Sequence, residues 1–140
     1  MGKRKKIKVL ETIIEGESEE RQKGEIKLDR YLLSETDLVT MVKKINSAGE
    51  IIRVVNVSYS IQYENKWIVI VRFDDFHGFL HRHTRISLEN PGTIDESINI
   101  IKRGSPKKWL SWAAKYLNKN FYGYKVGFAR RSKINILDLL

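Results

Sequence analysis

The histidines of this 140-residue chain, His77, His81 and His83, all fall within seven residues, and arginines lie on both sides of them. Imidazole accepts and donates protons near neutral pH, and guanidinium groups hold phosphate oxygens. RNA cleavage uses both, because a 2′-hydroxyl must lose a proton, a leaving 5′-oxygen must gain one, and the phosphate charge must be stabilised. The sequence therefore predicts a phosphodiester site. Its predicted catalytic residues are His81, His83, His77 and Asp74, with Arg72 and Arg85 holding the phosphate.

Two other interpretations of the histidines stay open. Side chains two residues apart on a strand point the same way, so His81 and His83 could share a metal ion. Asp74, Asp75 or His77 would then complete its ligands. Alternatively, the histidines are ordinary polar residues on a solvated sheet face. The phosphodiester interpretation, which we favour, needs no metal and no cofactor.

Three predicted strands must position this cluster, over 51–63, 67–73 and 80–88. Apolar and polar residues alternate in each of them, which is typical of a strand with one buried face. In an antiparallel meander, one face of the sheet packs against helices. The other face carries the histidines and arginines together.

The lengths of the two connections set the expected register of this meander. A three-residue turn between the first two strands would pair Ile61 with Val69, which is an allowed hairpin. A six-residue loop beginning at Asp74 would bring the third strand back with Arg72 opposite His81. The phosphate-binding and proton-transfer groups would then be direct neighbours.

Two helices are predicted around these strands from capping signals. Ser34 is a good N-cap and Asp37 follows three residues later, so we expect a helix over 35–48. A shorter helix is expected over 93–101, with Thr93 as its N-cap.

A third helix is predicted over 106–120, because Ser105 followed by proline is a sharp helix start. Gly123 and Gly127 are expected to break the chain after it, and residues 124–129 are expected to form an edge strand. The helix has an aromatic stripe that is predicted to lie in the core: Trp109, Trp112 and Tyr116.

Together with a strand over 25–33, these elements indicate an α+β fold. We predict an antiparallel sheet of three to five strands with two main helices packed on one face. The length suits one domain. We divide the chain into a flexible charged N-terminal segment (1–24), an α+β core domain (25–120) and a basic C-terminal extension with an apolar end (121–140).

Positive charge is concentrated near the C-terminus. The chain has a formal net charge of +9, of which residues 97–137 contribute +10 and all others −1. A localised basic surface attracts polyanions, so nucleic acid is the expected partner, with RNA favoured over DNA. An acidic protein or a purely solubilising role are the alternatives. Tyr122, Tyr124 and Phe128 could stack on unpaired bases. The predicted nucleic-acid-binding residues are Lys102, Arg103, Lys107, Lys108, Lys115, Lys125, Arg130, Arg131 and Lys133.

The absence of cysteine excludes a disulfide framework, a thiolate zinc site and a cysteine nucleophile. No apolar run approaches the roughly 20 residues of a membrane helix, and the N-terminus is too polar for a secretory signal. We therefore expect a soluble cytoplasmic protein with no membrane contact. The apolar end from Ile134 to Leu140 is expected to need a surface to cover it, such as a protein partner or a second copy of the chain.

The segment from Val71 to His83 resembles the core of small prokaryotic proteins of the TumE toxin type and their uncharacterised archaeal relatives. In both, a strand ends in an aromatic-acidic pair, and a short loop with histidine and glycine leads into a His-x-His strand. The likeness extends over 59–90, and the order of elements is also similar to that of RelE-type ribonuclease toxins. The resemblance implies a toxin that acts on RNA and has a small antitoxin as partner. The matching positions are Asp74, His77, Gly78, His81 and His83.

The sequence thus predicts an RNA-acting protein, in the form of a toxin-type, metal-independent ribonuclease that uses a histidine and arginine sheet face. The alternative is a non-catalytic nucleic-acid-binding protein that uses the basic C-terminal region. A third possibility is an interaction module that docks through its apolar C-terminal end.

Overall fold

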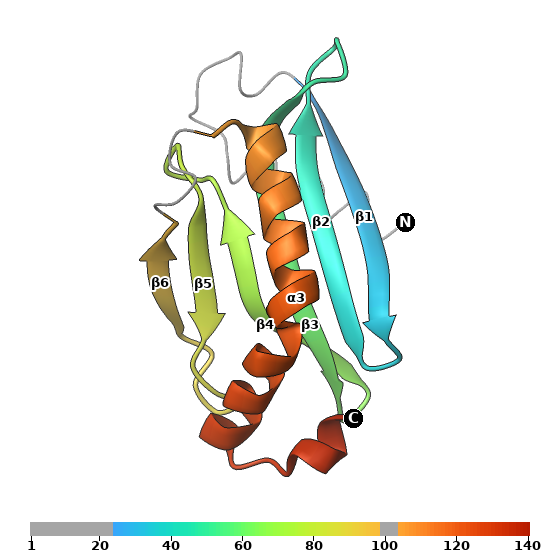
Figure 1. The fold of residues 1–140 in the computed structure, drawn as a ribbon, viewed down its shortest axis with the longest axis vertical. Helices are drawn as coiled ribbons and strands as arrows, with labels where there is room; N and C mark the ends of the chain where they lie inside the picture. Colours follow the sequence, from blue (N-terminus) through green and yellow to red (C-terminus); the bar gives the residue numbers. More distant parts are fainter. Residues whose placement is uncertain (1–23, 99–103) are drawn as a thin grey trace.

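The structure is a computed structural model that describes residues 24–98 and 104–140. Its strands follow one another in chain order across one sheet, each antiparallel to the next, and a long helix crosses one face (Figure 1). The elements are β1 (Glu25–Ser34), β2 (Asp37–Ile45), β3 (Ile51–Tyr63), β4 (Lys66–Asp74), β5 (His81–Arg85), β6 (Thr93–Ser97), α3 (Pro106–Ser132) and the 3-10 helix η1 (Ile136–Leu139).

The predicted fold class is wrong in two respects. The sheet has six strands instead of three to five, and the described residues contain one α-helix instead of two main helices. The strands predicted over 25–33, 51–63 and 67–73 are confirmed as β1, β3 and β4. None of the described helices is sufficiently long and apolar to span a membrane.

The segment predicted to be a helix over 35–48 is a tight turn followed by β2. Ser34 does contact Asp37, but its hydroxyl donates to the carboxylate at 2.5 Å and closes the turn between β1 and β2. β2 pairs with a strand on each side, and its β-branched Val39 and Val42 are buried, as suits a central strand. Pairing on both edges therefore overrides the local helical signal.

The second expected helix, over 93–101, is the strand β6 where the structure describes it, and residues 99–101 lie outside the described ranges. The Thr93 hydroxyl caps no helix there. It donates instead to Asp95 Oδ1 at 2.6 Å. β6 pairs with β5 along its whole length and forms one edge of the sheet.

The hairpin between β3 and β4 is tighter than predicted. Its turn consists of Glu64 and Asn65, whose φ angles of 49° and 63° suit a two-residue hairpin. Ile61 therefore lies opposite Ile68 and not opposite Val69. The pairing with β4 also shifts between Tyr59 and Ser60, so Trp67 and Val69, which the predicted pairing would place on the apolar face, are exposed.

α3 is twelve residues longer than predicted and runs through both glycines that were expected to end it. Its start is confirmed, because the Ser105 side chain accepts a hydrogen bond from the backbone of Lys108 and proline occupies the first turn. Two helical glycines each cost about 1 kcal/mol relative to alanine. Burial of Phe128 alone offsets roughly 1.5–3 kcal/mol, so the helix continues and the edge strand expected over 124–129 does not form.

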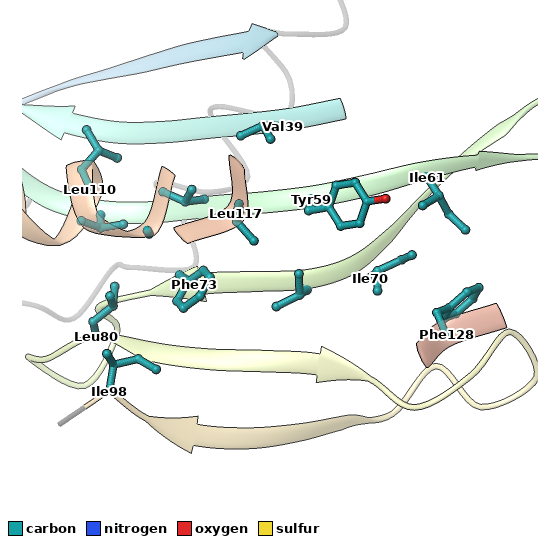
Figure 2. Packing of buried hydrophobic residues seen from close by; sticks show 14 of the residues in the cluster. Val39, Tyr59, Ile61, Ile70, Phe73, Leu80, Ile98, Leu110, Leu117 and Phe128 are labelled. Carbon is teal, nitrogen blue, oxygen red and sulfur yellow. The ribbon is translucent and has the colours of Figure 1, made fainter. Parts of the chain in front are cut away.

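The core lies between the helix and the strands that it crosses. Figure 2 shows side chains of β2, β3 and β4 meeting those of α3, among them Tyr59, Phe73 and Leu117, all fully buried. The Phe73 ring stands edge-on to the rings of Trp112 and Tyr116, with 5.8 Å between centroids in each pair. The prediction that the aromatic stripe of this helix lies in the core is confirmed for Trp109, which is buried, while Trp112 and Tyr116 are partly buried and pack against the core.

A buried ion pair joins α3 to the β1–β2 turn. Lys125 Nζ lies 3.1 and 3.2 Å from the two carboxylate oxygens of Asp37, and both side chains are almost fully buried. Tyr59 donates its hydroxyl to Asp37 Oδ1 at 2.5 Å, and Thr36 Oγ1 accepts from Lys125 at 3.3 Å. Burial, together with the adjacent carboxylate, raises the pKa of Tyr59, so its hydroxyl stays protonated. The predicted nucleic-acid contact Lys125 is therefore a structural cation.

The apolar C-terminal end folds back onto its own chain. Leu139 in η1 is fully buried, and its carbonyl accepts a hydrogen bond from Thr36 Oγ1 at 3.2 Å. Ile134 and Ile136 pack against the core. Much of the covering surface that this end was expected to need is thus supplied by the same molecule. Two leucines of the end remain exposed, Leu137 and Leu140.

Replacing Lys125 with methionine should lower the free energy of unfolding by about 3–5 kcal/mol, because Asp37 would keep a buried charge without a cation. Adding Asp37→Asn should restore part of this loss. Lys119→Met, on the exposed side of the same helix, should change stability by less than about 0.5 kcal/mol. Urea unfolding followed by tryptophan fluorescence measures all three variants. An equal loss for Lys125→Met and Lys119→Met would show that the pair does not stabilise the fold.

Candidate functional site

The two faces of β4 and β5 carry different chemistry. Phe73 and Arg82 lie on the helix face, because Phe73 contacts the rings of α3 and Arg82 donates to Tyr116 Oη at 2.9 Å. Side chains alternate along a strand, so Arg72 and His83 lie on the opposite face, which we call the open face. The predicted grouping of arginine and histidine on one polar face is therefore present in the structure.

The register on this face differs from the predicted one. Arg72 lies opposite His83, and Asp74 lies opposite His81, so the expected pairing of Arg72 with His81 is wrong by two residues. The strand predicted over 80–88 is also shorter, because β5 ends at Arg85. The loop between β4 and β5 keeps the predicted six residues but begins one residue later.

His83 is held between two carboxylates. Its Nδ1 lies 2.7 Å from Asp95 Oδ1 and its Nε2 lies 2.9 Å from Asp74 Oδ2, although this second contact lacks hydrogen-bond alignment. Only 14% of the His83 side chain is exposed. Both ring nitrogens therefore face protein groups, and His83 is better suited to organise the site than to exchange protons with a substrate.

Asp95 is a site residue that the sequence did not identify, because it fell in a segment predicted to be helical. A hydrogen bond from Thr93 and another from His83 lower its pKa, and the positive charge of Arg72 acts in the same direction. The carboxylate is thus kept ionised beside His83. A β-hairpin interpretation of 80–97 would have brought Asp95 opposite His83.

The two predicted phosphate-binding arginines differ in availability. Arg72 Nη1 lies 2.6 Å from Asp74 Oδ2, but 42% of the Arg72 side chain is exposed. Arg85 donates Nε to the Ser87 carbonyl at 2.9 Å and Nη2 to the Leu88 carbonyl at 2.8 Å. Arg85 is thus largely engaged in holding the loop after β5, and Arg72 is the better candidate for an anionic ligand.

His81 has the geometry that a proton acceptor needs. Its Nδ1 lies 3.0 Å from the Phe79 carbonyl oxygen, and a carbonyl can only accept, so Nδ1 carries the proton. In the neutral ring this leaves Nε2 with a lone pair. The His77 ring stands edge to face with His81 at 5.2 Å between centroids, and His81 stacks on His83 at 6.4 Å. The three histidines form one continuous row.

A hollow of about 300 Å³ lies beside this row on the open face. Arg72, His83 and Arg85 line it from β4 and β5, while Asn56 and Ser58 line it from β3. Among these side chains, Arg72, with 42% of its side chain exposed, can donate hydrogen bonds to an anion such as a phosphate. The hollow brings together the phosphate-binding pair predicted from sequence, whereas His81 and His77 lie outside its lining.

The metal-site interpretation finds no support in this geometry. Asp75, one of its proposed ligands, is buried against Arg53, with Arg53 Nε at 2.8 Å from Asp75 Oδ1. Within 24–98 and 104–140, no three histidine or acidic side chains converge as metal ligands would.

The exposed cations of α3 form a second candidate surface. The helix contains no acidic residue, and most of its lysines and arginines point away from the sheet. Two predicted contacts are committed elsewhere: Lys125 is buried, and Arg131 Nε donates to the Ile86 carbonyl at 2.6 Å. Lys102 and Arg103 lie outside the described residues, and Lys133, whose side chain is exposed, lies just after α3 as its C-cap residue. We call the remaining exposed set the basic face; it consists of Lys107, Lys108, Lys115, Lys119 and Arg130.

Of the three aromatic residues expected to stack on bases, Tyr122 is the most exposed, with 53% of its surface accessible. Phe128 is fully buried in the core. Tyr124 is partly buried, and its hydroxyl is hydrogen-bonded to that of Tyr116 at 2.9 Å. Burial raises the pKa of Tyr124, so this hydroxyl stays neutral.

The histidine row and the basic face lie on opposite sides of the sheet. α3 covers one face of the sheet (Figure 1), and the alternation of side chains along β4 and β5 places the row on the other. A nucleic acid that reaches both surfaces must therefore pass around an edge of the sheet. Substitutions on one of these two surfaces can therefore be made without changing residues of the other.

Comparison with known proteins assigns the chain to a family. Residues 21–134 match a domain of unknown function, DUF7718, and because this match covers most of the chain, the chain belongs to that family. No curated protein and no solved structure matches the chain. The family description names no activity, so the chemistry of the two surfaces is the remaining guide to function.

Replacing Thr93 with valine should raise the pKa of the Asp95 carboxyl toward its ordinary value, because the hydroxyl is the largest cause of the lowered pKa. The interaction stabilises the folded protein at pH values above the carboxyl range, and this contribution is lost as the pH falls through the lowered pKa. A carbon-detected NMR titration of the Asp95 side chain measures the change. Thr40→Val, in β2, serves as control. An unchanged titration of Asp95 in the Thr93 variant would contradict the assigned cause.

Proposed function

We propose that this DUF7718 protein acts on RNA and holds the strand along the basic face of α3. The observation that carries the proposal is that this surface has charges of one sign only: the five exposed cations of the basic face lie on a helix without any acidic residue. A surface whose role is only solubility usually carries both positive and negative charges. α3 is about 40 Å long at 1.5 Å per residue, which suits contact with several successive phosphates.

We further propose that the histidine row gives the protein ribonuclease activity without a metal. His81, whose Nε2 is left to accept a proton, would deprotonate the 2′-hydroxyl, and the adjacent His77 would protonate the leaving 5′-oxygen. Arg72 would stabilise the phosphate charge. The mechanism requires the 2′-hydroxyl, so RNA and not DNA is the proposed substrate. In this assignment His83 positions the row and is no longer proposed to transfer protons itself.

The likeness to TumE-type toxins supports the same activity and adds a small antitoxin as the proposed partner. The cytoplasm, where RNA and such a partner are present, is the proposed location. Leu137 and Leu140, which remain exposed, give an antitoxin or a second copy an apolar point of contact.

A second candidate function is binding of nucleic acid without cleavage. It is favoured by one specific observation: the basic face and the histidine row are on opposite sides of the sheet, so a strand held along α3 does not lie over the row. The two candidate functions differ in whether the histidines cleave the bound RNA. Two experiments distinguish them.

The first experiment measures RNA affinity as a function of salt. Replacement of Lys108, Lys115 and Lys119 by alanine should weaken binding of a single-stranded RNA. It should also reduce the slope of log affinity against log salt by about 2, since each phosphate contact contributes about 0.7. A control with three exposed cations of the sheet replaced, Lys27, Arg30 and Lys66, should keep the wild-type slope. Equal slopes in both variants would exclude the basic face as the RNA contact.

The second experiment measures cleavage of the same RNA in the presence of a chelator. His81→Ala should reduce the cleavage rate by about 10²-fold or more, because a lost general base typically costs that much, while affinity stays unchanged. A DNA strand of the same sequence should bind but remain intact. Binding without cleavage by the wild-type protein would rule out the ribonuclease and leave the binding function.

A further inference from the structure

A larger hollow lies on the helix face of the sheet, away from the histidine row. It has a volume of about 430 Å³ and is bounded by β5, β6 and the middle of α3. We call it the Arg82 pocket. The residues that define its chemistry are Arg82, Ile94, Glu96, Tyr116, Asn120 and Tyr124.

Arg82 is fixed at the centre of this pocket. Its Nη1 donates to the hydroxyls of Tyr116 and Tyr124, at 2.9 and 3.1 Å, and its Nη2 donates to Glu96 Oε2 at 3.0 Å. The guanidinium carbon also lies 5.7 Å from the centre of the Tyr116 ring. Its Nε has no hydrogen-bond partner among the described residues. This Nε is buried, so the donor edge that Arg82 offers to a ligand is the second N–H of Nη2, on a guanidinium whose orientation is fixed by its other contacts.

Acceptors lie beside this donor edge. Glu96 is about half exposed, so its carboxylate remains accessible from the pocket. Asn120 donates its amide nitrogen to the Tyr116 carbonyl at 2.8 Å, which orients the amide and leaves its oxygen as an acceptor. The pocket therefore offers a guanidinium, a carboxylate and an amide oxygen within one concave surface.

The walls of the pocket suit a flat ring. Ile94 of β6 has 55% of its surface exposed although it is apolar, and the Tyr124 ring lies on the helix side, next to the Tyr116 ring that Trp112 and Arg82 already cover. Gly123 lines the pocket between them, so no side chain from this position obstructs it. Apolar and aromatic surfaces of this kind stack with nucleobases.

We infer that the Arg82 pocket binds a guanine base of the RNA strand that α3 holds. Guanine accepts a hydrogen bond at O6, which suits the remaining N–H of Arg82 Nη2, and donates from N1 and N2, which suits Glu96 and Asn120. No other base presents one such acceptor beside two donor nitrogens. The inference rests on the proposed RNA binding, because α3 contributes both the basic face and one wall of the pocket.

The test compares four single-stranded RNAs that are uridine-rich and identical except for one central base. The wild-type protein should bind the strand with a central guanine about tenfold more tightly than the other three, as one good base-edge contact provides. Inosine at the same position, which lacks the N2 amino group, should lose most of this preference. Equal affinity for all four strands would overturn the guanine pocket while leaving the proposed RNA binding intact.

A pair of variants separates recognition of the base from binding of the backbone. Glu96→Gln should remove most of the guanine preference and leave the salt dependence of binding unchanged. Glu35→Gln, an exposed acid in the β1–β2 turn, removes the same charge far from the pocket and should keep the preference. Persistence of the preference in Glu96→Gln would contradict the assignment of the carboxylate.

Substitution at Gly123 tests the pocket volume without disturbing the fold. An added Cβ there would meet no heavy atom within 4 Å, so a side chain is tolerated. Gly123→Met should narrow the pocket and abolish the guanine preference, whereas Gly123→Ala should keep it and stabilise the helix. Retention of the preference in the methionine variant would overturn the pocket assignment.

Guanosine monophosphate, observed by NMR shifts of residues around Arg82, distinguishes a free nucleotide from a base within a strand. Binding of the nucleotide with no binding of any RNA would show that the pocket recognises guanine but that the proposed RNA function is wrong. Binding of neither would overturn both proposals.

Discussion

The ion pair between Lys125 and Asp37 is the constraint on which the arrangement of helix and sheet depends. A charge in the core costs several kcal/mol of folding free energy unless it is fully paired. Each of the two side chains can therefore be buried only in contact with the other. The Asp37 carboxylate accepts from Lys125, Tyr59 and the Ser34 hydroxyl, which come from the helix, the centre of the sheet and the first turn. These contacts tie Lys125, in the C-terminal half of α3, to the turn between β1 and β2.

Fixing α3 on one face determines what is left exposed on the other. The apolar side of the helix and its single buried lysine face the sheet, so the remaining lysines face solvent and carry one sign of charge. The opposite face of β4 and β5 stays without a helix, and there Asp74 and Asp95 clamp His83. The separation of the basic face from the histidine row is thus a consequence of the packing. β6, whose residues are all exposed, forms the edge of the sheet next to β5.

Local sequence signals predicted those elements whose stability is local. The alternation over 51–63 identified β3 correctly, and Ser105 with Pro106 located the start of α3. Where the structure of a segment depends on a residue far away in the sequence, the local signals predicted the wrong structure or role. The capping pattern at Ser34 is satisfied equally well by a turn, and Lys125 resembles any surface cation until Asp37, 88 positions away, is brought beside it. The register on the open face likewise depends on loop geometry, which composition does not fix.

The same alternation that groups the histidines also creates the Arg82 pocket. His81 and His83 point to the open face, so Arg82 between them must point toward α3, where a charged group needs partners. Tyr116 and Tyr124 supply hydroxyls in place of a purely apolar contact. Part of the Arg82 side chain stays exposed, and it lines the pocket that β5, β6 and α3 form on the helix face. One charged residue at an otherwise core-facing position of β5 thus belongs to a concave site on the helix face, while its two histidine neighbours belong to the open face.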